Sequence, residues 1–209
     1  MIVLRPPQPR CLTELEHINR YWDRANAIWV AKILPGEYYV TNQTDEVIAT
    51  TLGTCISACI RDKVTGIGGM NHFMLPQQNE DWGQEVTDSA IRYGSYVMEN
   101  LINNILKLGG RRENLEVKLT GGGQISSDMP NVNMKNIKFV LDYLRTENID
   151  VIVQDLGTIF PRKVLYYPSS GRLRVKKLQT MHNETLIQRE QVYSHELVQK
   201  PLSGSVELF

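Results

Sequence analysis

The chain has 209 residues, 42% of them hydrophobic, and its 23 basic residues balance its 23 acidic residues. This length suffices for one well-packed domain, and neither a net charge nor a long like-charge run points to a nucleic-acid or membrane partner. The longest apolar stretch, residues 48–60, is interrupted by polar residues and is shorter than the roughly 20 residues that span a bilayer. We therefore expect a protein that does not bind nucleic acid or insert into a membrane.

Cysteine content and the N-terminus bear on the cellular compartment. The three cysteines, Cys11, Cys55 and Cys59, cannot all pair with one another within the chain. The first ten residues lack the basic-then-apolar order of a secretory signal. Together these features predict a protein of the reducing cytoplasm.

The first third of the chain predicts an extension followed by a hairpin. Residues 12–26 have loosely helical spacing, and residues 27–40 are typical of extended structure. Residues 47–61 are rich in β-branched and small side chains and form a predicted strand that can bend at Gly53. A turn then leads into a second strand near His72, so the hairpin is expected to bring His72 close to Cys55.

Helices and strands alternate after this hairpin. Apolar residues at three- and four-residue steps predict a helix over residues 87–108, which Gly109 and Gly110 end. This order predicts an α/β fold, a single-domain layered sandwich with a mixed sheet. The remaining predicted elements are a strand at 115–120, an amphipathic helix at 136–147, a strand at 150–155 and a hairpin of 162–168 with 172–178.

The same patterns divide the chain into three parts. Residues 1–35 are predicted to be an N-terminal extension and residues 36–178 a catalytic domain. Residues 179–209 are predicted to be a polar C-terminal tail that adds little to the core.

Cys55 and His72 are the candidate nucleophile and general base. A thiol is a strong nucleophile only as a thiolate, so a catalytic cysteine needs a base within hydrogen-bond reach. Thr50 and Thr51 offer hydroxyl groups to orient the imidazole. The arrangement is suited to attack on a side-chain amide, with a thioester intermediate.

Backbone groups beside the cysteine are candidates for substrate and oxyanion binding. Gly53 permits a close approach, and the N–H groups at Thr54 and Cys55 can stabilise the oxyanion that forms when a thiolate attacks an amide. The Thr54 hydroxyl is a further candidate substrate contact.

Structural interpretations of the same residues remain open. Free cysteines are often small buried apolar residues, and a histidine beside Phe73 can simply complete a hydrogen bond in the core. Cys55 and Cys59 have a loose zinc-ligand spacing, but no second pair of ligands follows, so no metal site is predicted. The glycine run at residues 121–123 lacks the lysine of a phosphate-binding loop and favours a tight turn after a strand.

One stretch resembles a known family. The sequence LGTCISACIRDKVTGIGGMNHFMLP, residues 52–76, is similar to the chemoreceptor glutamine deamidase family CheD, whose hallmarks are LGSC, a GGM-type segment and HxxLP. The resemblance continues through RYGSYVMENLINNILKLGG, KLTGGGQI, the asparagine-rich residues 131–136, DLG and SGRLRVKKL, and thus covers roughly residues 36–178.

The resemblance implies roles for individual residues. Cys55 and His72 occupy the positions of the family's catalytic pair. The family's third catalytic residue is a threonine six positions before the cysteine, where this chain has Ala49, so Thr50 or Thr51 is expected to replace it. The implied fold is an α/β sandwich with Cys–His chemistry, and the mechanism needs no cofactor.

The implied function is that of a protein-glutamine glutaminase, an amidohydrolase of bacterial chemotaxis. Such an enzyme hydrolyses selected glutamines on the cytoplasmic helices of methyl-accepting chemotaxis receptors to glutamate. A CheC-type phosphatase is a further partner in some bacteria. The alternative is a binding module of the same fold that regulates such a phosphatase, or holds a receptor, without turnover.

Overall fold

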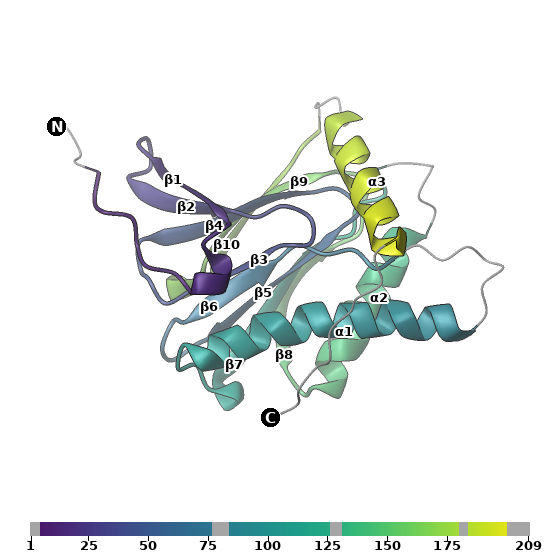
Figure 1. The fold of residues 1–209 in the computed structure, drawn as a ribbon, viewed down its shortest axis with the longest axis horizontal. Helices are drawn as coiled ribbons and strands as arrows, with labels where there is room; N and C mark the ends of the chain where they lie inside the picture. The colour runs from purple at the N-terminus through teal and green to yellow at the C-terminus, as the bar shows by residue number, and fades with distance from the viewer. Residues whose placement is uncertain (1–4, 77–83, 126–130, 180–183, 200–209) are drawn as a thin grey trace.

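Two five-stranded sheets pack face to face, and helices α1 and α2 cover the outer face of the second sheet (Figure 1). Apolar residues of both sheets, such as Ile48 and Ile60, belong to one buried cluster, so the main core lies between the sheets and extends beneath the helices. The computed structural model describes residues 5–76, 84–125, 131–179 and 184–199.

Each sheet contains one parallel pair of strands among antiparallel ones, so both sheets are mixed. The predicted α/β layered sandwich is therefore confirmed, with two mixed sheets in place of one. The first sheet has the order β1 (Asn19–Asp23), β2 (Ile28–Lys32), β4 (Glu46–Leu52), β9 (Arg162–Tyr167) and β10 (Arg172–Lys177). The second has the order β3 (Tyr38–Thr41), β6 (Gly68–Asn71), β5 (Ile56–Asp62), β7 (Leu115–Gly121) and β8 (Asp150–Leu156).

Helix α1 (Gln84–Lys107) packs on β3, β5 and β6 through apolar residues at helical spacing, including Val97, Leu101 and Ile105. It ends where predicted, because Gly109 adopts a left-handed φ of 100° and continues the chain away from the helix axis. The other helices are α2 (Val132–Thr146) and α3 (Glu184–Gln199), and short 3₁₀ turns lie at η1 (Thr13–Leu15), η2 (Arg112–Asn114) and η3 (Pro168–Ser170).

The predicted hairpins and the strands after residue 108 are confirmed, but the single strand predicted for residues 47–61 is in fact two strands, β4 and β5, which lie in different sheets. Strands β5 and β6 pair antiparallel, with Cys59 opposite Met70. The Asp62 carboxylate accepts hydrogen bonds from the backbone N–H groups of Val64 at 2.7 Å and Thr65 at 3.0 Å, which fixes the turn between them. Strands β9 and β10 form the second predicted hairpin.

The helical prediction for residues 12–26 is wrong beyond the short turn η1. Strand β1 occupies this stretch and pairs antiparallel with β2, with Tyr21 opposite Val30. Asp23 accepts hydrogen bonds from the backbone of Ala25 and Asn26 and shapes the turn that leads back into β2. Strand pairing in the tertiary structure therefore overrides a weak local periodicity.

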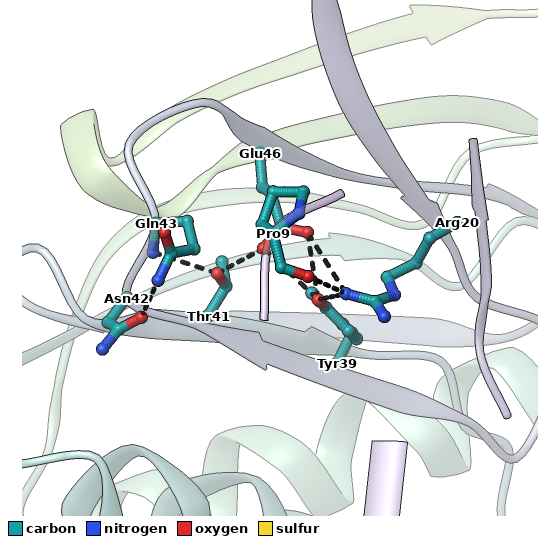
Figure 2. A network of polar contacts seen from close by, with 7 residues as sticks. All are labelled: Pro9, Arg20, Tyr39, Thr41, Asn42, Gln43 and Glu46. Atoms are coloured by element: carbon teal, nitrogen blue, oxygen red, sulfur yellow. Dashed lines mark hydrogen bonds and ion pairs between the residues drawn. The ribbon is translucent and has the colours of Figure 1, made fainter. Parts of the chain in front are cut away.

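A buried polar network ties the N-terminal residues to both sheets (Figure 2). Glu46, which is 1% exposed, accepts hydrogen bonds from the hydroxyls of Tyr39 and Thr41 and lies 3.9 Å from the Arg20 guanidinium. Arg20 in turn donates to the carbonyl oxygen of Pro9 at 2.8 Å. Residues of the predicted extension thus contribute two strands, β1 and β2, and the guanidinium group that pairs with the buried Glu46.

The predicted tail contributes α3, seen in yellow at the upper right of Figure 1. Tyr193 of α3 belongs to the main core cluster, and Leu197 packs against it, so this helix adds apolar contacts that its polar sequence did not predict. Within the described ranges, no helix combines the length and the apolar character needed to cross a lipid bilayer.

Candidate active site

Cys55 lies in the short link between β4 and β5, where the chain passes from one sheet to the other. Its side chain is fully buried. Two backbone hydrogen bonds hold the link: Gly123 N–H donates to the Gly53 carbonyl, and Gly122 N–H donates to the Cys55 carbonyl, both at 2.8 Å. The glycine run that follows β7 therefore holds residues 53–55, the cysteine turn, by backbone hydrogen bonds.

Close approach explains why glycine stands at position 121. A Cβ atom there would lie 2.3 Å from the Cys55 carbonyl oxygen, and the φ of 120° is one that other residues rarely adopt. Gly121 is the last residue of β7, and the two glycines that follow it bind the backbone of the cysteine turn.

His72 follows β6 and is brought beside Cys55 by strand pairing. Ile56 and Phe73 exchange backbone hydrogen bonds of 2.9 and 3.0 Å in an isolated bridge. Because successive side chains on a strand point to opposite faces, the residues just before these two, Cys55 and His72, both point to the other face. The Cys55 sulfur and a His72 ring nitrogen lie within 4.8 Å of each other.

Thr50 fixes the orientation and the tautomer of the imidazole. Its hydroxyl lies 2.8 Å from His72 Nδ1 and 2.9 Å from the Ile33 carbonyl oxygen. A hydroxyl has one proton, and the carbonyl can only accept it, so Nδ1 must carry the proton that Thr50 accepts. Nε2 is then left with a free lone pair, and it has no hydrogen-bond partner among the described residues.

Strand alternation separates Thr50 from its neighbours. In β4, Ile48, Thr50 and Leu52 face the space between the sheets. Ala49 packs instead in a small cluster on the outer face, and Thr51 also points outward, with no side-chain hydrogen bond in the described part of the chain. Of the two candidate threonines, the structure therefore brings Thr50 to His72 and not Thr51, and position 49 could not replace it.

Asn136 of α2 clamps the cysteine turn to the histidine strand. Its side-chain amide donates to the Thr54 carbonyl at 3.2 Å and accepts from the Leu75 N–H at 2.8 Å. Because this side chain is fully buried, both hydrogen bonds lie in a water-excluded environment. Sequence reasoning placed Asn136 in a family-like segment but assigned it no role.

The backbone N–H groups of the cysteine turn already bind a carboxylate. Glu190 of α3 accepts from the N–H of Gly53 at 2.8 Å, Thr54 at 2.7 Å and Cys55 at 3.4 Å. These are the donors that the sequence suggested for an oxyanion, so their ability to hold a negatively charged oxygen is visible in the structure. Glu190 was missed, because nothing local in a polar tail indicates contact with residues about 136 positions earlier.

Burial and charge set the protonation of the pair. Burial, the charge of Glu190 and a hydrogen bond to Glu190 raise the pKa of the Cys55 thiol well above its usual value. Burial, with a smaller effect of Arg189, lowers the pKa of His72 to about 3. The pair is therefore a neutral thiol facing a neutral imidazole in this conformation.

Cys55, His72 and Glu190 offer the types of atom that bind zinc, and their candidate ligand atoms lie within 4.8 Å of one another. The Glu190 carboxylate, however, already accepts hydrogen bonds from the backbone of the cysteine turn, which a metal ion would have to displace or share. Cys59, which the spacing had suggested as a second ligand, is not part of this cluster.

Comparison with known proteins places the chain in a family. A family model described as CheD chemotactic sensory transduction matches residues 74–177. A protein of Halorhodospira halophila is 51% identical over 204 residues, which are 96% of this chain and 94% of that protein. A protein of Methylobacillus flagellatus is 57% identical over 91% of this chain and 95% of its own length.

Both relatives bear the name probable chemoreceptor glutamine deamidase CheD. A solved structure, that of the Neisseria meningitidis protein NMB0706, aligns with 58% of this chain and 53% of its own at 11% identity and a TM-score of 0.37. The sequence matches span nearly the whole chain, including both ends of the region with the family-like motifs. This chain belongs to the CheD family.

Proposed function

We propose that this chain is a protein-glutamine deamidase that hydrolyses glutamine side chains of methyl-accepting chemoreceptors to glutamate. The observation that carries the proposal is the hydrogen-bonded series of Ile33 carbonyl, Thr50 hydroxyl and His72 imidazole, which leaves Nε2 with a free lone pair. A ring nitrogen of this imidazole lies within 4.8 Å of the Cys55 sulfur. The names of the relatives supply the substrate, a glutamine of a chemoreceptor.

The residues support a two-step reaction. Nε2 of His72 accepts the thiol proton while Cys55 Sγ attacks the amide carbon, and the N–H groups of Gly53, Thr54 and Cys55 stabilise the oxyanion. His72 then protonates the departing ammonia, which leaves a thioester. Water, activated by the same imidazole, hydrolyses the thioester and restores the thiol. Thiol, imidazole and backbone donors are sufficient for every step, so we propose no cofactor.

The proposal includes a cytoplasmic location and cytoplasmic receptor helices as substrate. A catalytic thiol persists in a reducing compartment, and Cys11, Cys55 and Cys59 are all free. A CheC-type phosphatase as a further partner stays a prediction from the family resemblance.

Mass spectrometry of a receptor tests the proposal. The purified cytoplasmic domain of a cognate chemoreceptor is incubated with the wild-type protein in ¹⁸O-labelled water, and hydrolysis is expected to add about 3 Da at particular glutamines, because oxygen from water replaces the amide nitrogen. A receptor with those glutamines replaced by alanine is the control. Binding of the receptor without any labelled glutamate would contradict the proposal and support the binding module.

The two neighbouring threonines give a matched test of the imidazole's orientation. Thr50→Val is expected to lower kcat/KM about 10- to 100-fold, because His72 loses the acceptor that fixes its tautomer. Thr51→Val, on the outer face of the same strand, is expected to leave kcat/KM unchanged. Steady-state rates of ammonia release measure both variants, and equal losses would contradict the assignment.

A further inference from the structure

Glu190 is an unusual residue for a site that is proposed to handle glutamine. It lies on α3, is fully buried, and reaches the turn of Cys55 from the far end of the sequence. Fully buried carboxylates need compensating partners, and its partners are the backbone N–H groups of Gly53 and Thr54, with Cys55 N–H more distant.

The position of Glu190 is that of a reaction product. Hydrolysis of a glutamine leaves a glutamate whose carboxylate carbon was bonded to the cysteine sulfur one step earlier. Glu190 places a carboxylate of the same side-chain length on the proposed oxyanion donors, within 4.8 Å of the sulfur and the imidazole. A Cβ atom on Gly53 would lie 2.2 Å from Ile125 Cδ1 and 2.7 Å from Glu190 Oε2, so glycine at position 53 makes room for both side chains.

One face of α3 packs against the rest of the protein next to Cys55. Tyr193, one turn after Glu190, packs over Gly36, and its hydroxyl is hydrogen-bonded to that of Tyr93 on α1. Ser194 is also buried, and Leu197 packs against the core, so the seated positions follow the i, i+3, i+4, i+7 pattern. Helix α3 thus presents Glu190 to Cys55 as a helix with one buried face.

The seated helix also disables the nucleophile. Cys55 has no exposed surface, and His72 is 1% exposed, so no substrate can reach them in this conformation, in which Glu190 of α3 binds the N–H groups beside Cys55. Burial is the largest cause that raises the pKa of the Cys55 thiol, and the charge of Glu190 and a hydrogen bond to it raise this pKa further. The conformation described here is therefore a closed one.

We propose that α3 is a built-in product mimic, in which Glu190 takes the place of the newly formed glutamate and α3 covers the surface that a glutamine-bearing substrate helix must occupy. The inference rests on the proposed function and deepens it. Substrate binding then requires α3 to leave, and a substrate glutamine on a helix competes with Glu190 for the same N–H groups.

Replacing Glu190 by glutamine should convert the product mimic into an intramolecular substrate. In the variant Glu190→Gln the side-chain amide carbon lies beside Cys55 Sγ, so a carbon–sulfur bond can form while the thiol proton passes to His72. The carbon–nitrogen bond then breaks, and ammonia leaves with that proton. Water adds to the thioester, returns a proton through His72 to the sulfur, and leaves glutamate at position 190. No reactant other than water is consumed.

Peptide mass spectrometry of the purified full-length Glu190→Gln protein tests this step. We expect the glutamine introduced at position 190 to be converted to glutamate with a gain of about 1 Da, at a rate independent of protein concentration because the reaction is intramolecular. Gln188, which is exposed on the same helix, is the internal control and stays unchanged. The double variant Cys55→Ala, Glu190→Gln is expected to keep both amides.

Conversion of receptor glutamines and conversion of the glutamine at position 190 are measured separately, so the product mimic and the deamidase activity can each fail alone. Conversion of receptor glutamines with an unchanged amide at position 190 overturns the product mimic and leaves the deamidase intact. Failure of the wild type to convert any receptor glutamine overturns the deamidase. If the amide at position 190 of the Glu190→Gln protein also stays unchanged, both the deamidase and the product mimic are overturned.

Alkylation of Cys55 gives a second measurement that does not depend on catalysis. Glu190→Ala is expected to speed the reaction of Cys55 with iodoacetamide at least about 10-fold, because α3 loses its polar anchor and the site opens more often. Glu184→Ala, at an exposed position of the same helix, is the matched control and stays slow. Acceleration of the wild type by EDTA, without acceleration in Glu190→Ala, would identify a metal ion as the element that closes the site and overturn the proposal.

Discussion

Replacing Cys55 by alanine is expected to lower the rate of receptor glutamine hydrolysis at least about 10⁴-fold. The sulfur forms the covalent bond to substrate in the proposed mechanism, and an alanine methyl group cannot replace it, so only the slow attack of water on the bound amide remains. The rate is measured as glutamate formed in a receptor domain under single-turnover conditions, which separates chemistry from α3 opening and product release.

Cys59 provides the matched control for this variant. It lies four residues later, is also fully buried, and faces the core in β5, outside the cluster of Cys55, His72 and Glu190. Cys59→Ala removes the same atom and is expected to keep activity within a few-fold while lowering the thermal midpoint. Equal activity of the wild type and the Cys55→Ala protein would eliminate the covalent mechanism.

Replacing His72 by alanine is expected to lower kcat/KM about 10³-fold. Once α3 has left the site, the neutral imidazole can accept the thiol proton at Nε2, whereas an alanine side chain offers no base and leaves the thiol protonated. The loss is smaller than for Cys55 because a small fraction of thiolate forms without a base.

The control for His72 is His17, an exposed histidine in the N-terminal part of the chain. His17→Ala is expected to match the wild type. Near-ultraviolet circular dichroism of both variants tests whether the fold is retained, since His72 also contributes backbone hydrogen bonds to Gly36 and Glu37. A folded His72→Ala protein with wild-type kcat/KM would exclude the imidazole as the base.

Local patterns were sufficient to predict the hairpin that joins Cys55 to His72. Alternating β-branched residues, a turn of small and polar residues and a second strand fix this unit within a short span, and strand pairing then brings the two side chains together. The same span could not decide between Thr50 and Thr51. That choice depends on which face of β4 meets the second sheet, a property of the packed structure.

Long-range contacts were beyond the reach of the sequence. Strand β1 forms because β2 offers it a partner, although its own spacing is weakly helical. Asn136 contacts Thr54 from 82 positions away, and Glu190 contacts Cys55 from 135 positions away, so no local periodicity could indicate either contact. The sequence of α3 is polar and typical of a surface helix. Only the structure shows that one face, which includes Glu190 and Tyr193, is buried.

The hydrogen bond from Thr50 to the Ile33 carbonyl determines where a minimal catalytic unit of this chain can begin. Ile33 follows β2 and lies within the first 35 residues. Without that carbonyl the Thr50 hydroxyl is free to donate to Nδ1 instead of accepting from it. The imidazole then carries its proton on Nε2, the nitrogen that has to accept the thiol proton in the proposed mechanism. The N-terminal residues are thus part of the acid–base chemistry through a backbone carbonyl group.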